Sequence, residues 1–263
     1  MLSINVLVVG ATGVAGSAFV EHIQTQQKAG VCDWRLTGVT RRKVDANEGG
    51  GVSYITADLM ADHSVMGTLR DITHVVFAGF VPAPDFAQQV APNRDILVNC
   101  LRALGGNPLQ RIVLIQGMKY YGSHLGAFKT PAREDDPRHD GENYYYAQQD
   151  VLEQSGIEWT CLRPHVICGT TSIGTPQNIL TVIGVYASLM RAAGKPLHWP
   201  GSEQGFRCIN QATDAGLLAR AIEWSLKSTG AANEAFNVTN GDFFRWQHLW
   251  PKVAALFLSL IHI

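Results

Sequence analysis

The feature that most constrains this chain is a glycine-rich segment close to its N-terminus. An apolar run typical of a buried strand, Asn5–Val9, leads into Gly10-Ala11-Thr12-Gly13-Val14-Ala15-Gly16, and a helix is expected from about Ser17 to Lys28. Glycines at this spacing let the backbone turn tightly and approach a pyrophosphate, whose charge lies at the helix N-terminus. A tight turn without a ligand is the plain alternative, but the flanking strand and helix favour dinucleotide binding. We assign Gly10, Thr12, Gly13, Val14 and Gly16 to the cofactor-binding surface.

Apolar, β-branched runs then alternate with helical patterns along the chain. Further strands are expected at Arg35–Val39, Val52–Ala57, Thr73–Ala78, Arg111–Gln116 and Trp159–Arg163, with helices at Gln88–Leu104 and Tyr145–Ser155 among them. Continuous apolar strands separated by helices are typical of a parallel sheet covered on both faces. The sequence therefore predicts an α/β fold of Rossmann type, with a doubly wound parallel sheet.

The pattern changes after Pro164. Helices are expected at about Asn178–Ala193 and Thr213–Leu226, a short strand at Ala235–Val238, and a last helix from about Trp246. We interpret this region as a smaller C-terminal lobe that covers the ligand edge of the sheet. The expected domains are a dinucleotide-binding domain over 1–165 and a partial substrate-binding lobe over 166–263.

Cofactor preference is usually decided at the end of the second strand. An acidic residue there bonds the ribose 2′-hydroxyl of NAD, whereas arginine accommodates the 2′-phosphate of NADP. This chain has Thr40-Arg41-Arg42 at that point, and two guanidinium groups suit a phosphate well. An ordinary solvated basic turn is the alternative. We expect NADPH as the cofactor, held by Arg41 and Arg42.

Asp58 follows the third expected strand and is placed to meet the adenine. Its pattern fits a loop-capping aspartate equally well. We also assign Leu59, Gly79, Ile167 and Tyr145 to the cofactor-binding surface.

Composition excludes some partners and favours others. The formal net charge is −1, so no basic excess exists to neutralise nucleic-acid phosphates. The longest apolar stretch, near Ile179–Met190, is too short and too mixed to span a bilayer. No N-terminal leader pattern precedes the glycine segment, and the five cysteines show no C-x-x-C pair, which indicates a cytoplasmic protein without a metal centre.

Several segments resemble the extended short-chain dehydrogenase/reductase superfamily, and more narrowly the progesterone 5β-reductase and iridoid synthase family with its bacterial relatives. They are Val9–Gly16, Gly38–Arg42, Thr73–Phe77, Gly117–Gly122, Asn143–Tyr146, Arg163-Pro164 and Asn233–Asp242. The resemblance extends from Val6 to Phe257. It implies NADPH-dependent reduction of the C=C bond of an α,β-unsaturated carbonyl compound, so that the expected partner is a small-molecule enone. A homodimer is the assembly to be considered.

The resemblance also implies the catalytic residues. Common short-chain dehydrogenases carry Tyr-x-x-x-Lys, but glutamine or aspartate follows each of Tyr144, Tyr145 and Tyr146 by four residues. In the family that this chain resembles, the lysine comes from the loop after the fifth strand, which gives Lys119. The tyrosine maps to Tyr145, with Tyr146 as the neighbouring alternative. Without the resemblance, an aromatic cluster packed on the sheet and a surface lysine would be the better interpretations.

Other positions depart from the family. Met118 and Tyr120 flank the lysine where the family has arginine and histidine, and His165 follows Arg163-Pro164 in place of glycine. We interpret His165 as a hydrogen-bonded structural histidine, with proton transfer as the alternative. Phe128 and Tyr146 are the expected substrate contacts.

Three further expectations are open to test. A nucleotide-sugar epimerase or dehydratase would share the glycine loop, and a non-catalytic NADP-binding redox sensor would share the fold. The tail Leu258–Ile263 matches nothing in the family, so we expect a chain shortened at its C-terminus, with Trp246, Trp250 and Phe257 exposed.

Overall fold

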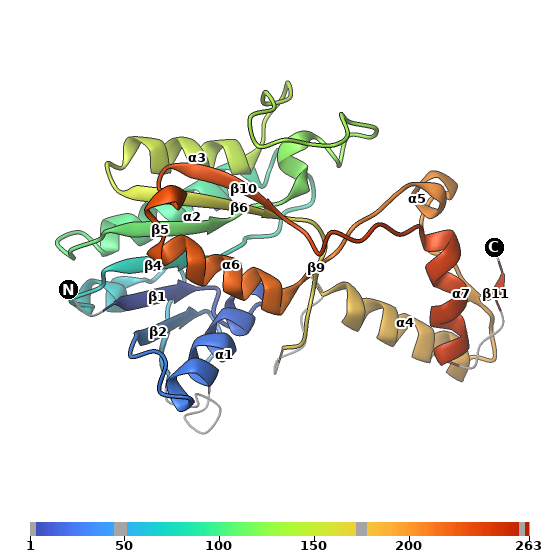
Figure 1. Cartoon of the computed structure of the whole chain (residues 1–263), viewed down its shortest axis with the longest axis horizontal. Coiled ribbons are helices and arrows are strands. Elements are labelled where there is room, and N and C mark those ends of the chain that lie inside the picture. The colour runs from blue at the N-terminus through green and yellow to red at the C-terminus, as the bar shows by residue number, and fades with distance from the viewer. Residues whose placement is uncertain (1–3, 45–51, 172–177, 258–260, 263) are drawn as a thin grey trace.

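The computed structural model describes residues 4–44, 52–171, 178–257 and 261–262. Its centre is a seven-stranded parallel sheet in the order β10-β6-β5-β4-β1-β2-β3 (Figure 1). The strands are β1 (Asn5–Val9), β2 (Arg35–Thr40), β3 (Ser53–Thr56), β4 (His74–Phe77), β5 (Arg111–Ile115), β6 (Glu158–Pro164) and β10 (Glu234–Val238). The Rossmann-type α/β fold predicted from the sequence is confirmed, and each predicted strand lies within two residues of its observed bounds.

Helices cover both faces of the sheet. They are α1 (Val14–Lys28), α2 (Val90–Ala103), α3 (Tyr144–Gln154) and α6 (Ala215–Lys227), with the short 3-10 helices η1 (Ser64–Thr68), η2 (Met118–Tyr121) and η3 (Thr229–Ala231). Helix α1 packs beside α6, and α2 packs beside α3. Predicted helix starts were displaced by a few residues, because the glycine loop passes into α1 at Val14 and because β9 occupies the first two residues of the helix predicted at Thr213.

Side chains that point alternately to the two faces of the sheet form two hydrophobic cores, one on each face. Val6 and Val8 of β1 point into one cluster with Phe19 of α1 and Leu218 of α6. Leu7 and Val9 point into the opposite cluster, with helix residues such as Leu97 of α2. Because successive strand residues face opposite sides, a continuous apolar run is the pattern that a sheet buried on both faces requires.

The remaining elements form the smaller lobe. They are α4 (Ile179–Ala192), α5 (Glu203–Arg207) and α7 (Trp246–Leu256), with short strands β7 (Ile167–Cys168), β8 (Leu197–His198), β9 (Thr213–Asp214) and β11 (Ile261–His262). Figure 1 shows α4, α5 and α7 to one side of the sheet.

The boundary expected after residue 165 does not follow the sheet. Helix α6 packs on α1, and β10 pairs in parallel with β6 at the sheet edge. Residues 215–238 therefore belong with the dinucleotide-binding domain, although they follow α4 and α5 in the chain. Sequence order alone could not show this, because the chain returns to the first sheet after forming part of the second lobe.

Of the three side chains expected to be exposed near the end of the chain, Trp250 is buried, so the prediction is wrong for this residue. Trp250 is buried against Ala187 and Phe206, and its indole nitrogen donates a hydrogen bond to the Leu197 carbonyl at 3.1 Å. Trp246 and Phe257 are half-buried against the same cluster. The tail residues 258–260 and 263 lie outside the described residues. Within the described part of the chain, no helix has the length and apolar character needed to cross a membrane.

His74, in the middle of the sheet, is a titratable group that folding keeps neutral. Burial lowers its pKa to about 4, and the neighbouring Arg111 guanidinium adds to that shift. In an unfolded chain a histidine takes up its proton near pH 6.5, so on acidification the unfolded state binds this proton first. The free energy of unfolding should therefore fall between about pH 6.5 and pH 4, by roughly 3 kcal/mol from this residue.

Urea unfolding of the parent and of His74→Gln, measured across this range, tests the prediction. The variant should lose much of the pH dependence between 6.5 and 4. Glu223, whose pKa is lowered to about 2, contributes stability that is lost only below about pH 4.5, so it leaves most of this interval unaffected. Identical pH dependence in the two proteins would contradict the assignment.

Candidate active site

The glycine loop joins β1 to α1 at the carboxyl edge of the sheet. Gly10 has φ +77°, and its amide donates to the Val39 carbonyl at 3.1 Å. A Cβ at Gly10 would lie 2.6 Å from the Ala78 carbonyl oxygen, and one at Gly16 would lie 2.3 Å from the Gly10 oxygen. The loop runs against the end of β4, and the first turn of α1 lies directly on the loop. Because of these close approaches, neither glycine position tolerates a side chain.

The N-terminus of α1 is open to a ligand. Gly13 is its N-cap residue, and no side chain caps the helix or places a negative charge in its first turn. The first amides of a helix need acceptors and carry a partial positive charge. Gly13 also lines a pocket, which places this helix end beside open space. The arrangement fits a pyrophosphate.

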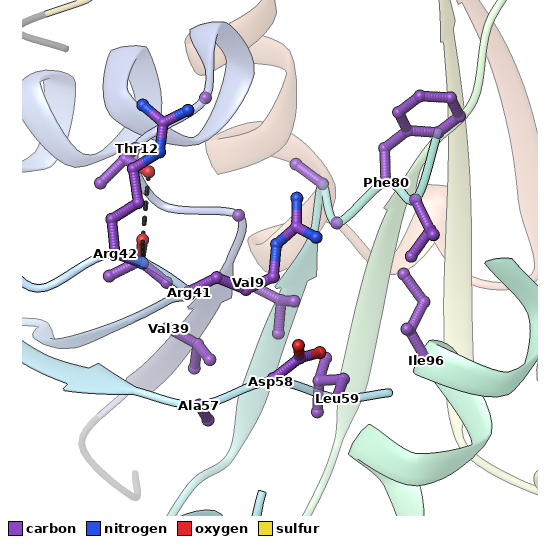
Figure 2. Close-up of a pocket in the computed structure, with 16 residues that line it drawn as sticks. Val9, Thr12, Val39, Arg41, Arg42, Ala57, Asp58, Leu59, Phe80 and Ile96 are labelled. Carbon is purple, nitrogen blue, oxygen red and sulfur yellow. Dashed lines mark hydrogen bonds between the residues drawn. The ribbon is translucent and has the colours of Figure 1, made fainter. Parts of the chain in front are cut away.

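The pocket has a volume of about 370 Å³ and extends from the glycine loop across the ends of β2, β3 and β4 (Figure 2). Of the residues assigned to the cofactor from sequence, those in its lining are Gly10, Thr12, Gly13, Arg41, Arg42, Asp58, Leu59 and Gly79. The lining further includes Val39, Ala57 and Ile96, which supply apolar surface beside Asp58. An apolar slot with a carboxylate at its edge is suited to a purine ring.

Polar contacts hold the end of β2 in place. The Thr40 hydroxyl accepts from the Arg42 amide at 3.2 Å and lies 3.3 Å from the Thr12 hydroxyl, the contact drawn in Figure 2. Arg41 and Arg42 are exposed, and within the described residues neither guanidinium forms an ion pair. Two unpaired cations at the pocket rim fit an anionic group. Asp58 accepts from the Met60 amide at 2.9 Å, so it caps its loop and lines the pocket at once.

Four of the expected cofactor residues lie outside this lining. Gly16 serves the packing of α1 on the loop. Val14 is buried at the start of α1, and a Cβ placed on Gly169 would lie 3.3 Å from its side chain. Ile167 lies in β7 and pairs with Thr213 of β9. Tyr145 lies beyond the pocket, at the start of α3.

Tyr145 and Lys119 belong to two segments that meet beyond the ends of β5 and β6. A Cβ placed on Gly117 would be 3.1 Å from the Tyr145 hydroxyl oxygen and 3.4 Å from the Pro164 carbonyl. The absence of a side chain at Gly117 therefore leaves room for the phenol to lie close to the backbone after β5. Burial raises the pKa of the Tyr145 hydroxyl, and the neighbouring Tyr144 partly opposes the shift. The hydroxyl stays protonated at neutral pH and can donate.

Asn143 joins the lysine loop to the tyrosine helix. Its side-chain oxygen caps α3 by accepting from the Tyr145 amide at 3.0 Å. Its side-chain nitrogen donates to the Lys119 carbonyl at 2.8 Å. Asparagine directly before a helix is a recognisable capping signal, whereas the second bond depends on tertiary structure. The Lys119 side chain is exposed, and its ammonium lies 5.2 Å from the centre of the Phe86 ring.

Arg163, like Asn143, is a residue of the site to which the sequence pattern assigned no role. It is fully buried at the end of β6, and its guanidinium lies 3.4 Å from the centre of the Tyr120 ring. It donates to Gln116, Tyr121 and Gln149 side chains and to the Glu134 carbonyl, at 2.9–3.3 Å. Gln116 in turn donates to the Tyr145 carbonyl at 3.0 Å. The sequence signal that could have indicated this role is an arginine near the end of an apolar strand.

Tyr146, the other residue expected to contact the substrate, is held by two hydrogen bonds of its hydroxyl. Tyr146 is buried, and its hydroxyl donates to the Tyr120 carbonyl and accepts from the His139 amide, at 2.5 Å and 3.0 Å. These two bonds hold the loop before α3. Phe128 and Tyr145 both pack against the aromatic cluster that contains Tyr146.

His165 forms a hydrogen bond through Nδ1 with the Gln211 carbonyl, and burial lowers its pKa. This geometry agrees with a structural, neutral imidazole that ties the end of β6 to the segment before β9.

Comparisons with known proteins agree with this architecture. The model of a family described as the PRISE-like Rossmann-fold domain matches residues 6–260. An (S)-8-oxocitronellyl enol synthase from Nepeta cataria is 33% identical over 95% of this chain and 68% of its own length. A short chain dehydrogenase from Penicillium aethiopicum is 30% identical over 94% of this chain and 69% of its own length.

Solved structures share the fold at lower identity. The UDP-glucuronic acid 4-epimerase of Bacillus cereus in complex with NAD superposes with a TM-score of 0.74 at 16% identity, over 98% of this chain and 84% of that one. The Bordetella bronchiseptica enzyme WbmH in complex with NAD+ superposes with a TM-score of 0.72 at 19% identity, over 98% of this chain and 85% of that one.

The double role of Asn143 can be tested against a matched residue. Asn178 also caps a helix, α4, by accepting from the Leu180 amide, and it also donates to a loop carbonyl, that of Gly169. Asn143→Ala and Asn178→Ala should each lower the free energy of unfolding by about 1–3 kcal/mol, from the lost cap and an unpaired carbonyl. Only Asn143→Ala should speed amide hydrogen exchange over residues 117–122. Equal exchange there in both variants would contradict the link.

Proposed function

Because this chain belongs to the PRISE-like Rossmann-fold family, within the extended short-chain dehydrogenases and reductases, we propose that it is an NADPH-dependent reductase of α,β-unsaturated carbonyl compounds. The observation that carries the proposal is the Tyr145 hydroxyl above Gly117, with Lys119 supplied by the loop that follows β5. Its relatives include a synthase named for an enol product, whose formation requires stabilisation of an enol oxygen.

The chemistry follows from what each residue offers. Bound NADPH supplies a hydride. When the β-carbon of an enone accepts it, the electron pair of the C=C bond moves toward the carbonyl and negative charge develops on the oxygen as an enolate. The Tyr145 hydroxyl donates a hydrogen bond where this charge develops, which lowers the barrier more than it tightens substrate binding. The α-carbon then takes a proton from solvent, and the saturated carbonyl compound leaves.

In the proposed reaction, Lys119 contributes positive charge to the surroundings of this oxygen. An ammonium close to the tyrosine favours donation by its hydroxyl and can also hold the cofactor ribose. Asn143 fixes the backbone of Lys119 relative to α3, and Phe86 provides an aromatic face for the ammonium. The Lys119 side chain therefore contacts Phe86, which itself packs on Tyr144 of α3.

The position at which common short-chain dehydrogenases carry their lysine is closed here. Gln149 follows Tyr145 by four residues, is buried, and bonds to Arg163 and Glu153. The missing lysine opposes the epimerase or dehydratase alternative. The UDP-glucuronic acid 4-epimerase that superposes on this chain is 16% identical to it, and identity that low indicates a shared fold alone. The redox-sensor alternative has no catalytic tyrosine, whereas Tyr145 is retained.

Preference for NADPH is proposed from Arg41 and Arg42 at the rim of the cofactor pocket. A charge-assisted hydrogen bond contributes about 1.5–3 kcal/mol, or about 10- to 100-fold in affinity. Arg41→Ala should weaken NADPH binding by about that factor and leave NADH binding nearly unchanged. Lys43→Ala, which removes a nearby charge outside the pocket lining, is the matched control. Fluorescence titration with both cofactors gives the affinities, and equal losses for NADPH and NADH in Arg41→Ala would refute the assignment.

The reaction itself is tested by following NADPH absorbance with a simple cyclic enone. The parent should yield the saturated ketone, identified by mass spectrometry, with its carbonyl intact. Tyr145→Phe should lower turnover by about 10²–10³-fold while the dissociation constant of NADPH changes little, because a transition-state contact is removed. Lys119→Ala should impair both turnover and cofactor binding. An alcohol product would show ordinary carbonyl reduction instead.

A further inference from the structure

Asn237 of β10 belongs to the segment Asn233–Asp242, which carries part of the family resemblance but has no part in the proposed chemistry. Within the described residues β10 is an edge strand that pairs only with β6, and Asn237 lies beside Arg163 in the register. Alternate backbone amides of an edge strand point away from the sheet and have no strand to accept them. At Asn237 a loop supplies the acceptor instead, because the Asn237 amide donates to Oε1 of Glu134 at 2.7 Å.

The side chain of Asn237 makes two further bonds. Its nitrogen donates to the Ala132 carbonyl at 3.2 Å, and its oxygen accepts from the Tyr121 hydroxyl at 2.8 Å. Arg163 fixes these directions, because a guanidinium can only donate and it bonds to the same hydroxyl at 2.9 Å, which leaves the Tyr121 proton for Asn237. Asn237 thus ties β10 both to η2 and to the loop between η2 and α3, residues 122–143, which we call the η2–α3 loop.

The η2–α3 loop touches the surroundings of the candidate catalytic residues at two places. Near its start, the His124 ring lies 4.0 Å from the Phe86 ring, between centres, and the Lys119 ammonium lies 5.2 Å from the centre of that same Phe86 ring. Further along, Phe128 packs against the aromatic cluster on which Tyr145 also packs. The loop therefore flanks the region in which the proposed reaction takes place.

We propose that Asn237 is a positioning residue for substrate binding, which together with Glu134 holds the η2–α3 loop where Phe128 meets the enone. The proposal rests on the enone reductase function proposed above. The loop contains no helix or strand, so its position depends on packing and on bonds such as those at Ala132 and Glu134. Within the described residues, none of the loop lines the cofactor pocket. Releasing the loop should therefore weaken enone binding and leave cofactor binding unchanged.

The test is the steady-state kinetics of enone reduction, with the dissociation constant of NADPH measured beside it. Asn237→Ala should raise the KM of the enone about 10-fold, the effect of two lost neutral hydrogen bonds, with kcat and NADPH affinity nearly unchanged. Glu134→Ala, a change at an exposed residue, should raise KM about 3-fold through the one bond that it removes. Glu134→Gln keeps an acceptor for the Asn237 amide and should restore the parent KM.

Asn233→Ala is the matched control for structural effects. Asn233 joins the other end of β10 to β6, where its side-chain oxygen accepts from the Trp159 amide at 3.3 Å. A loss of stability alone lowers the fraction of active protein, and hence the apparent kcat, without changing KM. Asn233→Ala should therefore leave the KM of the enone unchanged.

An unchanged KM in both Asn237→Ala and Glu134→Ala, or an equal rise in Asn233→Ala, would overturn the proposal. Amide hydrogen exchange decides the anchoring of the loop even if the parent reduces no enone. Exchange over residues 122–134 should be faster in Asn237→Ala and Glu134→Ala than in the parent, and unchanged in Asn233→Ala. Unchanged exchange in the first two variants would also overturn the proposal. Faster exchange without any enone turnover by the parent would retain the anchoring and refute the proposed function alone.

Discussion

The candidate site depends on one buried guanidinium. Arg163 lies at the end of β6, and within the described residues no carboxylate bonds to it. Neutral oxygens and an aromatic face take the place of a counter-ion. Its partners come from the end of β5, the 3-10 helix η2, the loop before α3 and α3 itself. These segments carry Lys119 and Tyr145, so the bonds of Arg163 set the framework within which the two side chains are placed. Removing a cation so enclosed leaves several buried acceptors unpaired at once, each at a cost of about 1–3 kcal/mol.

The sequence predicted the layers of this molecule better than its connections. Strand β1 and the glycine loop were located closely, because buried parallel strands and tight turns have strong local patterns. The return of α6 and β10 to the first sheet was missed, since the pairing of β10 with β6 joins residues about seventy positions apart and no local pattern encodes it. The same holds for Trp250, whose burial depends on α4 and β8 residues far away in the chain.

The site was predictable to a similar degree. Loop residues near the first three strands, such as Gly13, Arg41 and Asp58, were identified because their order along the chain mirrors their order around the pocket. Asn143, Gln116 and Arg163 were not, because their importance lies in bonds to other segments. Tyr146 was assigned to the substrate on position alone, and only the partners of its hydroxyl distinguish it from Tyr145.

The path of the chain between the two lobes has a mechanical consequence. The chain leaves the sheet after β6, returns between α5 and α6, and leaves again between β10 and α7. Two of these crossings pair with each other through the Asn210–Phe244 bridge, and the Asp214 amide bonds the Asn240 side chain. A lobe on a single tether can swivel freely, whereas one held by three crossings can bend toward the sheet but resists rotation about the connection. The smaller lobe should therefore present the same face to the carboxyl edge of the sheet throughout its motion, and a single proteolytic cut between the lobes should not release it.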